Sequence, residues 1–156
     1  MNRNLNIFLI LLIALSGCGF KIKNQSELIN FNIVEFIGSG EQRINFRIKN
    51  KILRNLEKNN PKNIKLTIET KKEKNNKEKN LKNEITKYEI TLTAKVTFVE
   101  IGFQNENSFL IQEKGEFSVN KQHSQTITSE KKLIEDLSES LADEILEELI
   151  ENLNAN

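Results

Sequence analysis

The stretch that decides the fold is Tyr88-Glu89-Ile90-Thr91-Leu92-Thr93-Ala94-Lys95-Val96-Thr97-Phe98. Apolar and aromatic side chains occupy every second position, and polar side chains occupy the positions between them. Because successive residues of a strand point to opposite faces, this alternation predicts a half-buried strand. A sheet built from such strands needs cover on one face only, so the rest of the chain must supply one covering layer.

Three further stretches predict strands beside this one. Ile64–Glu69 alternates in the same way, and Ile29–Ile37 is rich in Ile, Val and Phe. The stretch up to Val119 has four apolar residues on one parity: Phe109, Ile111, Phe117 and Val119. The Lys/Asn/Glu run from Lys71 to Asn83 has almost no apolar residue and predicts a long solvated hairpin loop. Gly102–Ser108 predicts a turn before the last strand.

Two amphipathic patterns predict the covering helices. The first begins after a capping-box pattern, Ser39 with Gln42, and ends before Pro61. Its apolar residues recur at four-residue steps, with Phe46 and Leu53 flanking them: Ile44, Ile48, Ile52 and Leu56. The second begins at Thr128 or Ser129 and carries an apolar stripe to Leu153, with His123 in the turn before it.

The element order is therefore β-α-β-β-β-α. This order predicts an α+β two-layer sandwich, in which two helices cover one face of a four-stranded mixed sheet. The first helix would connect parallel strands by a right-handed crossover. We expect a single domain over residues 29–153.

The N-terminus has the features of a secretory signal. Arg3 supplies a positive charge, and Ile7–Leu15 is apolar but shorter than the roughly 20 residues that a membrane-spanning helix needs. The sequence Leu15-Ser16-Gly17-Cys18 that follows resembles the bacterial lipobox. The resemblance implies that residues 1–17 are a cleaved signal peptide and that Cys18 carries S-diacylglycerol and an N-acyl group such as palmitate. Residues 18–28 would then be a lipidated tether.

The residues around Cys18 also bear on location. Gly19 is not the Asp that commonly retains such lipoproteins at the inner membrane. We therefore expect attachment to the outer membrane at its periplasmic face, through acyl chains that anchor stably when two or more are present.

The sequence offers little for catalysis. One Cys and one His exclude an intrachain disulfide and a Cys- or His-rich metal cluster. Gly38-Ser39-Gly40 lacks the lysine of a phosphate-binding loop, and no nucleophile elbow surrounds Ser124. The sequence predicts a protein that is not an enzyme and that holds no cofactor and no metal.

Charge is unevenly distributed along the chain. Residues 18–129 hold 20 Lys and Arg against 13 Asp and Glu, whereas residues 130–156 hold 2 against 9. The most basic run contains Lys71, Lys72, Lys74, Lys77, Lys79 and Lys82. These lysines would contact phosphate groups of lipid or lipopolysaccharide, or, interleaved with Glu73 and Glu78, would only solubilise a loop. No aromatic residues are interleaved to stack bases, so nucleic acid is not an expected partner.

Taken in order, these features resemble the LptE family of lipopolysaccharide-assembly lipoproteins. Four stretches, in this order along the chain, carry the resemblance: Gly17-Cys18-Gly19-Phe20, Arg43–Ile52, Tyr88–Ala94 and Leu141–Ile145. It departs from the family at Lys21-Ile22-Lys23 and in the long lysine-rich run before Tyr88.

The resemblance implies a one-to-one plug inside the LptD outer-membrane β-barrel, help in assembling that barrel, and binding of lipopolysaccharide on its way to the cell surface. It implies lipopolysaccharide contacts at Lys79, Lys82 and Lys87, among which Lys82 matches by its spacing from Tyr88. A pilot-type lipoprotein of another outer-membrane secretion complex stays open from the sequence, whereas a lipid-anchored enzyme is disfavoured by the missing catalytic residues.

Overall fold

The computed structural model describes residues 29–56, 60–103 and 105–154. The predicted signal peptide, Cys18 and the tether up to residue 28 lie outside the described residues. The elements follow the chain as β1 (Phe31–Gly40), α2 (Gln42–Asn55), β2 (Lys62–Lys79), β3 (Ile85–Glu100), β4 (Glu106–Ser118) and α3 (His123–Asn154).

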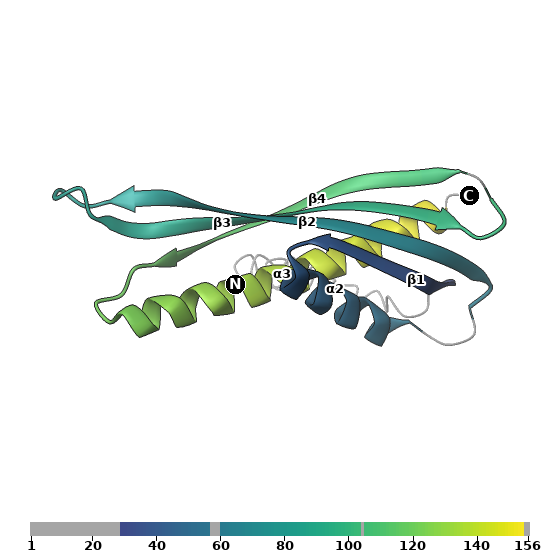
Figure 1. Cartoon of the computed structure of the whole chain (residues 1–156), viewed down its shortest axis with the longest axis horizontal. Coiled ribbons are helices and arrows are strands. Elements are labelled where there is room, and N and C mark those ends of the chain that lie inside the picture. The colour runs from purple at the N-terminus through teal and green to yellow at the C-terminus, as the bar shows by residue number, and fades with distance from the viewer. Residues whose placement is uncertain (1–28, 57–59, 104, 155–156) are drawn as a thin grey trace, which may run out of the picture.

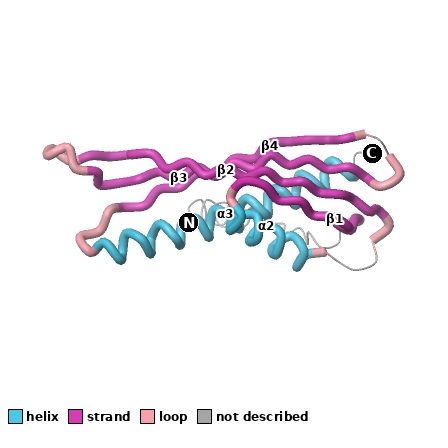
Figure 2. Tube along the Cα trace, viewed as in Figure 1, coloured by secondary structure: helices cyan, strands magenta, loops and turns pink. Residues whose placement is uncertain are grey.

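The strands form one sheet in the order β1-β2-β3-β4. β1 and β2 are parallel and are connected through α2, whereas the β2–β3 and β3–β4 pairs are antiparallel. Both helices lie on the same face of this sheet (Figures 1 and 2). The α+β two-layer sandwich with β-α-β-β-β-α order and a mixed four-stranded sheet is thus confirmed.

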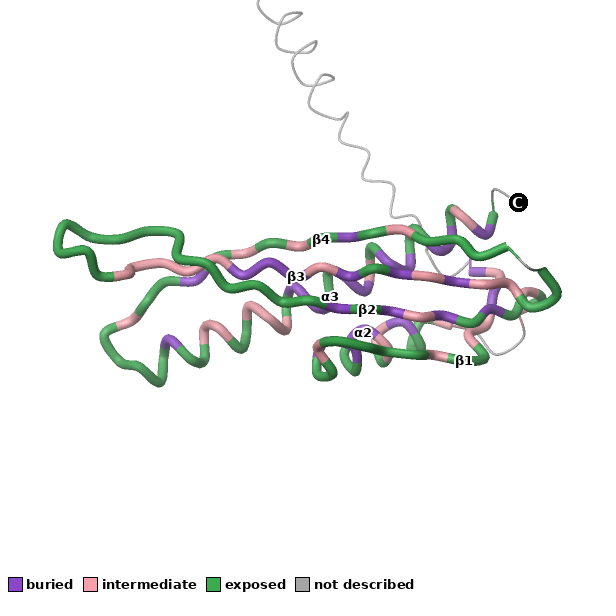
Figure 3. Tube along the Cα trace, turned by 45° about the horizontal axis from the view of Figure 1, so that its top comes forward, coloured by how far each residue is buried: buried purple, intermediate pink, exposed green. Residues whose placement is uncertain are grey.

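The core fills the space between the sheet and the helices. Ile90, Leu92, Ala94, Val96 and Phe98 of β3 are all at most 1% exposed, as their alternation predicts. α2 and α3 contribute their apolar stripes from the other side, so the buried segments of the central strands face those of the helices (Figure 3). The opposite sheet face carries mainly Thr, Lys and Glu and is not covered by any element among the described residues.

The prediction of a loop over Lys71–Asn83 is wrong. β2 continues to Lys79, and the register runs from Lys71 opposite Thr93 to Lys79 opposite Ile85. Only residues 80–84 form the turn. A strand can be polar on both faces when both faces meet water, because the hydrogen bonds of the ladder are made by the backbone.

The predicted capping box is also wrong. Ser39 lies inside β1, and α2 begins after Glu41, whose side chain makes no capping bond. Gly40 has φ of +82°, which turns the chain so that the backbone N–H of Glu41 donates to the Thr70 hydroxyl oxygen at 3.1 Å. The Asn45 amide reaches back and donates to the carbonyl oxygen of Ser39 at 2.7 Å.

Two boundaries near the C-terminal half differ from the predicted ones. β3 and β4 are joined by a shorter turn than Gly102–Ser108, because β4 begins at Glu106. α3 begins at His123 rather than at Thr128 or Ser129, so His123 is helical rather than part of a turn. The hydroxyl of Thr126 accepts the backbone N–H of Asn120 at 2.9 Å and closes the connection from β4. Neither of the two helices described, α2 and α3, contains an apolar stretch that could span a bilayer.

Candidate functional site

The three lysines predicted to contact lipopolysaccharide lie at the far end of the β2–β3 hairpin. Lys79 is the last residue of β2, Lys82 lies in the turn, and Lys87 is near the start of β3. This end of the hairpin extends well beyond β1 and α2, at the left of Figure 1. We call residues 77–89 the hairpin tip.

The turn of the hairpin tip is organised by Asn80. Its side-chain oxygen accepts the backbone N–H groups of Lys82 at 2.9 Å and Glu84 at 3.0 Å. Asn83 adopts φ of 65°, a left-handed conformation that Asn tolerates better than most residues. The turn leaves the Leu81 side chain fully exposed, with a relative accessibility of 108%. An apolar residue is thereby presented next to Lys82.

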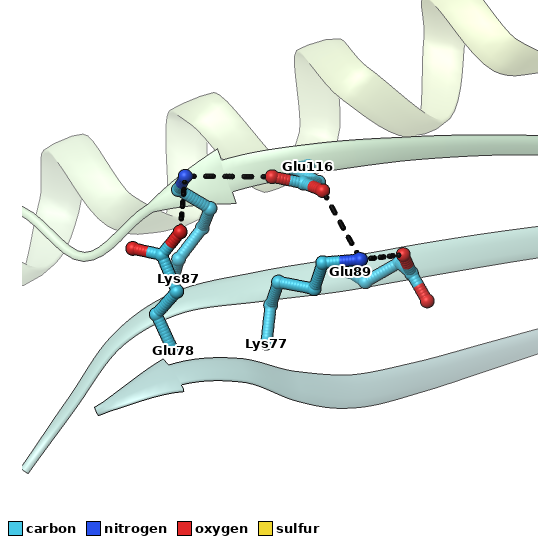
Figure 4. Close-up of polar contacts among 5 residues, drawn as sticks. All are labelled: Lys77, Glu78, Lys87, Glu89 and Glu116. Carbon is cyan, nitrogen blue, oxygen red and sulfur yellow. Dashed lines mark hydrogen bonds and ion pairs between the residues drawn. The ribbon is translucent and has the colours of Figure 1, made fainter.

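Two lysines of the hairpin tip, Lys77 and Lys87, pair with carboxylates on the open face of the sheet (Figure 4). Lys77 Nζ lies 2.8 Å from Glu89 and 3.3 Å from Glu116. Lys87 Nζ lies 2.8 Å from Glu78 and 3.4 Å from the other oxygen of Glu116. Glu116 of β4 therefore bridges both lysines, and the three strands are cross-linked by charge.

The ion pairs keep these groups ionised. The hydrogen bonds that Lys77 donates to Glu89 and Glu116 raise the pKa of Lys77, and the hydrogen bond that Lys87 donates to Glu78 raises the pKa of Lys87. The hydrogen bond from Lys77 lowers the pKa of Glu89. The positive charge of Lys87 is therefore largely balanced before any ligand arrives.

Lys79 and Lys82 differ from this pattern. Lys79 Nζ donates to the Asn83 side-chain oxygen at 3.1 Å, a neutral partner. Neither Lys79 nor Lys82 has an ion pair with a carboxylate in the part of the chain that the structure describes. Lys79 and Lys82 are thus the lysines of the hairpin tip without a carboxylate partner, and they stand on either side of exposed Leu81 in the sequence.

Lys74 has a structural role that sequence reasoning missed. It points to the helix side of the sheet, where its Nζ lies 2.6 Å from Glu130 of α3. The same nitrogen lies 4.4 Å from the centre of the Tyr88 ring and 5.1 Å from that of Phe117. The basic run is therefore not one uniform surface, because Lys74 holds α3 to the sheet and Lys71 pairs with Glu73 at 2.6 Å.

A second surface lies between the two helices. A groove of about 1200 Å³ is lined by residues of α2 together with Glu135 and Glu139 of α3. Phe46 and Leu53, which the helical pattern placed at the edge of the core, are 66% and 39% exposed here. Their seven-residue spacing on the polar side of the helix is the sequence signal that marks this surface.

Carboxylates gather at the edge formed by β4 and α3. Burial, followed by a hydrogen bond with Glu113, raises the pKa of Glu144, and the negative charges of Glu147 and Glu148 act in the same direction. Within residues 29–56, 60–103 and 105–154, no three His, Cys, Asp or Glu side chains are grouped so as to hold a metal ion.

Comparison with known proteins finds likeness in structure rather than in sequence. No protein-family model and no curated protein sequence matches the chain. Rare lipoprotein B of Shewanella oneidensis superposes with a TM-score of 0.64 at 14% identity, over 80% of this chain and 98% of that one.

Two more bacterial lipoproteins superpose over similar lengths. A lipoprotein of Caulobacter crescentus gives a TM-score of 0.57 at 12% identity, over 85% of this chain and 96% of that one. Lipoprotein B of Nitrosomonas europaea gives 0.59 at 14% identity, over 88% and 94%. The chain thus has the fold of these lipoproteins across nearly their whole length.

Proposed function

We propose that the chain is an outer-membrane lipoprotein of the LptE type, anchored through Cys18, which plugs and helps to assemble an LptD-like β-barrel and binds lipopolysaccharide during export. The observation that carries this proposal is the combination of a lipobox-like Leu15-Ser16-Gly17-Cys18 with a fold that covers 98% of rare lipoprotein B. Neither feature alone would select this function, since folds are shared among unrelated activities.

The surface of the domain supports the plug role. A barrel lumen is polar and wet, so an occupant with charged faces is better solvated there than an apolar one. This domain has an uncovered sheet face bearing ion pairs, and after Lys132 the exposed residues of α3 are mostly acidic. Its action would be binding and assembly rather than catalysis.

The hairpin tip supports the lipopolysaccharide role. Lys79 and Lys82 offer cations without carboxylate partners, and Leu81 offers an apolar contact between them. Phosphate groups and acyl chains of an amphiphile would engage these two kinds of side chain together. Lys87 would contribute less, because Glu78 and Glu116 already balance its charge.

The proposal is tested with the full-length chain in a Gram-negative host. We expect radiolabelled palmitate on the natural chain and none on Cys18→Ala, together with co-purification of an LptD-like barrel from outer membranes. Absence of the label from the natural chain would remove the anchor from the proposal. Recovery of a different secretion barrel would favour the pilot-type function instead.

A further inference from the structure

α2 carries cations on two sides, and those on one side already pair with carboxylates of α3. On the flank that faces α3, Arg47 pairs with Glu135, and Lys51 Nζ lies 3.3 Å from Asp143. Lys51 also lies 4.0 Å from Glu139. Cations four residues apart on α2 thus pair with carboxylates that are spaced four residues apart on α3.

The other two cations lie on the opposite side of α2 from the buried Ile44 and Ile48, as the helical period requires. We call this side the outer face of α2, and its five residues all line the groove beside α3: Arg43, Phe46, Asn50, Leu53 and Arg54. Among the described residues neither Arg43 nor Arg54 has an ion-pair partner.

The composition of the outer face indicates what it would bind. The backbone positions of Arg43 and Arg54 are about 17 Å apart along the helix axis, and two exposed apolar side chains lie between them in the sequence. Arg pairs well with carboxylates at interfaces because its planar fork donates two hydrogen bonds at once. The pairs on the side that faces α3 show that this helix accepts carboxylate partners.

We infer that the outer face of α2 is the docking surface for a carboxylate-bearing protein wall. The inference rests on the proposed function, under which that wall is the inner surface of the partner β-barrel. Arg43 and Arg54 would pair with acidic side chains that line the barrel lumen, while Phe46 and Leu53 would pack between those pairs. The barrel would therefore meet the domain on its helix layer.

The test compares two charge reversals of equal size in the full-length chain, co-expressed with its barrel. We expect R43E/R54E to lower the recovered barrel about tenfold, since it replaces two attractions by two repulsions. The control K95E/K114E, on the open face of the sheet, should change recovery less than twofold. R43K/R54K should restore only part of the recovered barrel, because the charges return but the planar fork that donates two hydrogen bonds does not. A photo-crosslinking residue in place of Phe46 should form an adduct with the barrel.

The outcomes separate this inference from the proposed function. Full recovery of the barrel with a correctly folded R43E/R54E chain, and no adduct from position 46, would overturn the inference and leave the proposed function intact. An adduct with lipid in place of protein would overturn it as well. Failure of the natural chain to recover any barrel would overturn the proposed function, and this inference with it.

Discussion

Lys74 of β2 places its ammonium nitrogen 2.6 Å from the carboxylate of Glu130 on α3. Their side chains are 35% and 26% exposed, so this pair is more shielded from water than a typical surface ion pair. The same ammonium lies over the rings of Tyr88 and Phe117, which are stacked 5.5 Å apart. Lys74 thus links the beginning of α3 to the far part of the sheet by an ion pair and ring contacts.

Lys74→Ala should detach that end of the helix. We expect a loss of about 1–2 kcal/mol in unfolding free energy, from the ion pair and the cation–π contacts together. Hydrogen exchange of the first turns of α3 should accelerate more than exchange at its C-terminal end. Lys72→Ala, on the same face of β2, is the matched control and should change stability by less than about 0.5 kcal/mol. Equal losses in the two variants would contradict this role.

Gly40→Ala should destabilise the fold through two separable effects. The residue has φ of +82°, and an added Cβ would lie 2.0 Å from the carbonyl oxygen of Thr70, which is backbone and cannot rotate away. We expect a loss of about 2–4 kcal/mol in unfolding free energy, measured by denaturant titration. Gly102→Ala is the control for backbone strain alone, since φ there is +100° with no atom within 4 Å of the added Cβ. If Gly40→Ala lost no more unfolding free energy than Gly102→Ala, the clash with Thr70 would have to be relieved by a shift of the backbone.

The sequence predicts the core of this fold because the core depends on local periodicity. The alternation of Tyr88–Phe98 and the four-residue steps of Ile44, Ile48 and Ile52 each select one buried face, and those faces are buried. Hydrophobic periodicity gives no signal of secondary structure where both faces of an element meet water. Lys71–Lys79 was therefore predicted as a loop, although its backbone is paired with β3.

The candidate site was predicted only in part for a related reason. Spacing along the chain placed Lys79, Lys82 and Lys87 at one end of the molecule, but it could not show which lysines meet carboxylates from other strands. Glu116 neutralises Lys87 across a long stretch of sequence, and Glu130 engages Lys74 across a longer one. The outer face of α2 was missed because Phe46 and Leu53 were interpreted as flanking the buried stripe of the helix, whereas both side chains are exposed.

Glu144→Gln should stabilise the domain at neutral pH. Burial and the neighbouring Glu113 raise the Glu144 pKa, so the folded state holds its proton more tightly than the unfolded state does. That proton stabilises the fold fully at pH below the unfolded pKa, and the contribution is lost as pH rises through the folded pKa. Because burial withdraws only a small part of the Glu144 side chain from water, we expect a gain of only about a few tenths of a kcal/mol at pH 7 that disappears toward pH 4.

Denaturant titrations at several pH values check this. Glu113→Gln should give a similar gain, and the double variant should give less than the sum of the two, because each change removes the same repulsion. Glu151→Gln, further along α3, is the control and should show no comparable gain at pH 7. A destabilised Glu144→Gln variant at that pH would contradict the assignment.

Lys79→Ala/Lys82→Ala should weaken lipopolysaccharide binding and spare the barrel complex. Each lysine near an anionic surface contributes about 1 kcal/mol, so removing both should lower affinity at least about tenfold at low salt. The loss should shrink as salt rises, because these side chains are exposed and their attraction for phosphate is screened. Binding would be measured with purified lipopolysaccharide at two ionic strengths.

The matched control removes the same charge elsewhere. Lys95→Ala/Lys114→Ala lowers the net charge by the same two units on the open face of the sheet, so a purely long-range effect of charge would appear equally in both variants. Binding that is unchanged in Lys79→Ala/Lys82→Ala, or lowered equally in both pairs, would remove the hairpin tip from the site. Leu81→Ser, which keeps both lysines, should lower affinity without altering its salt dependence, because it removes only the apolar contact.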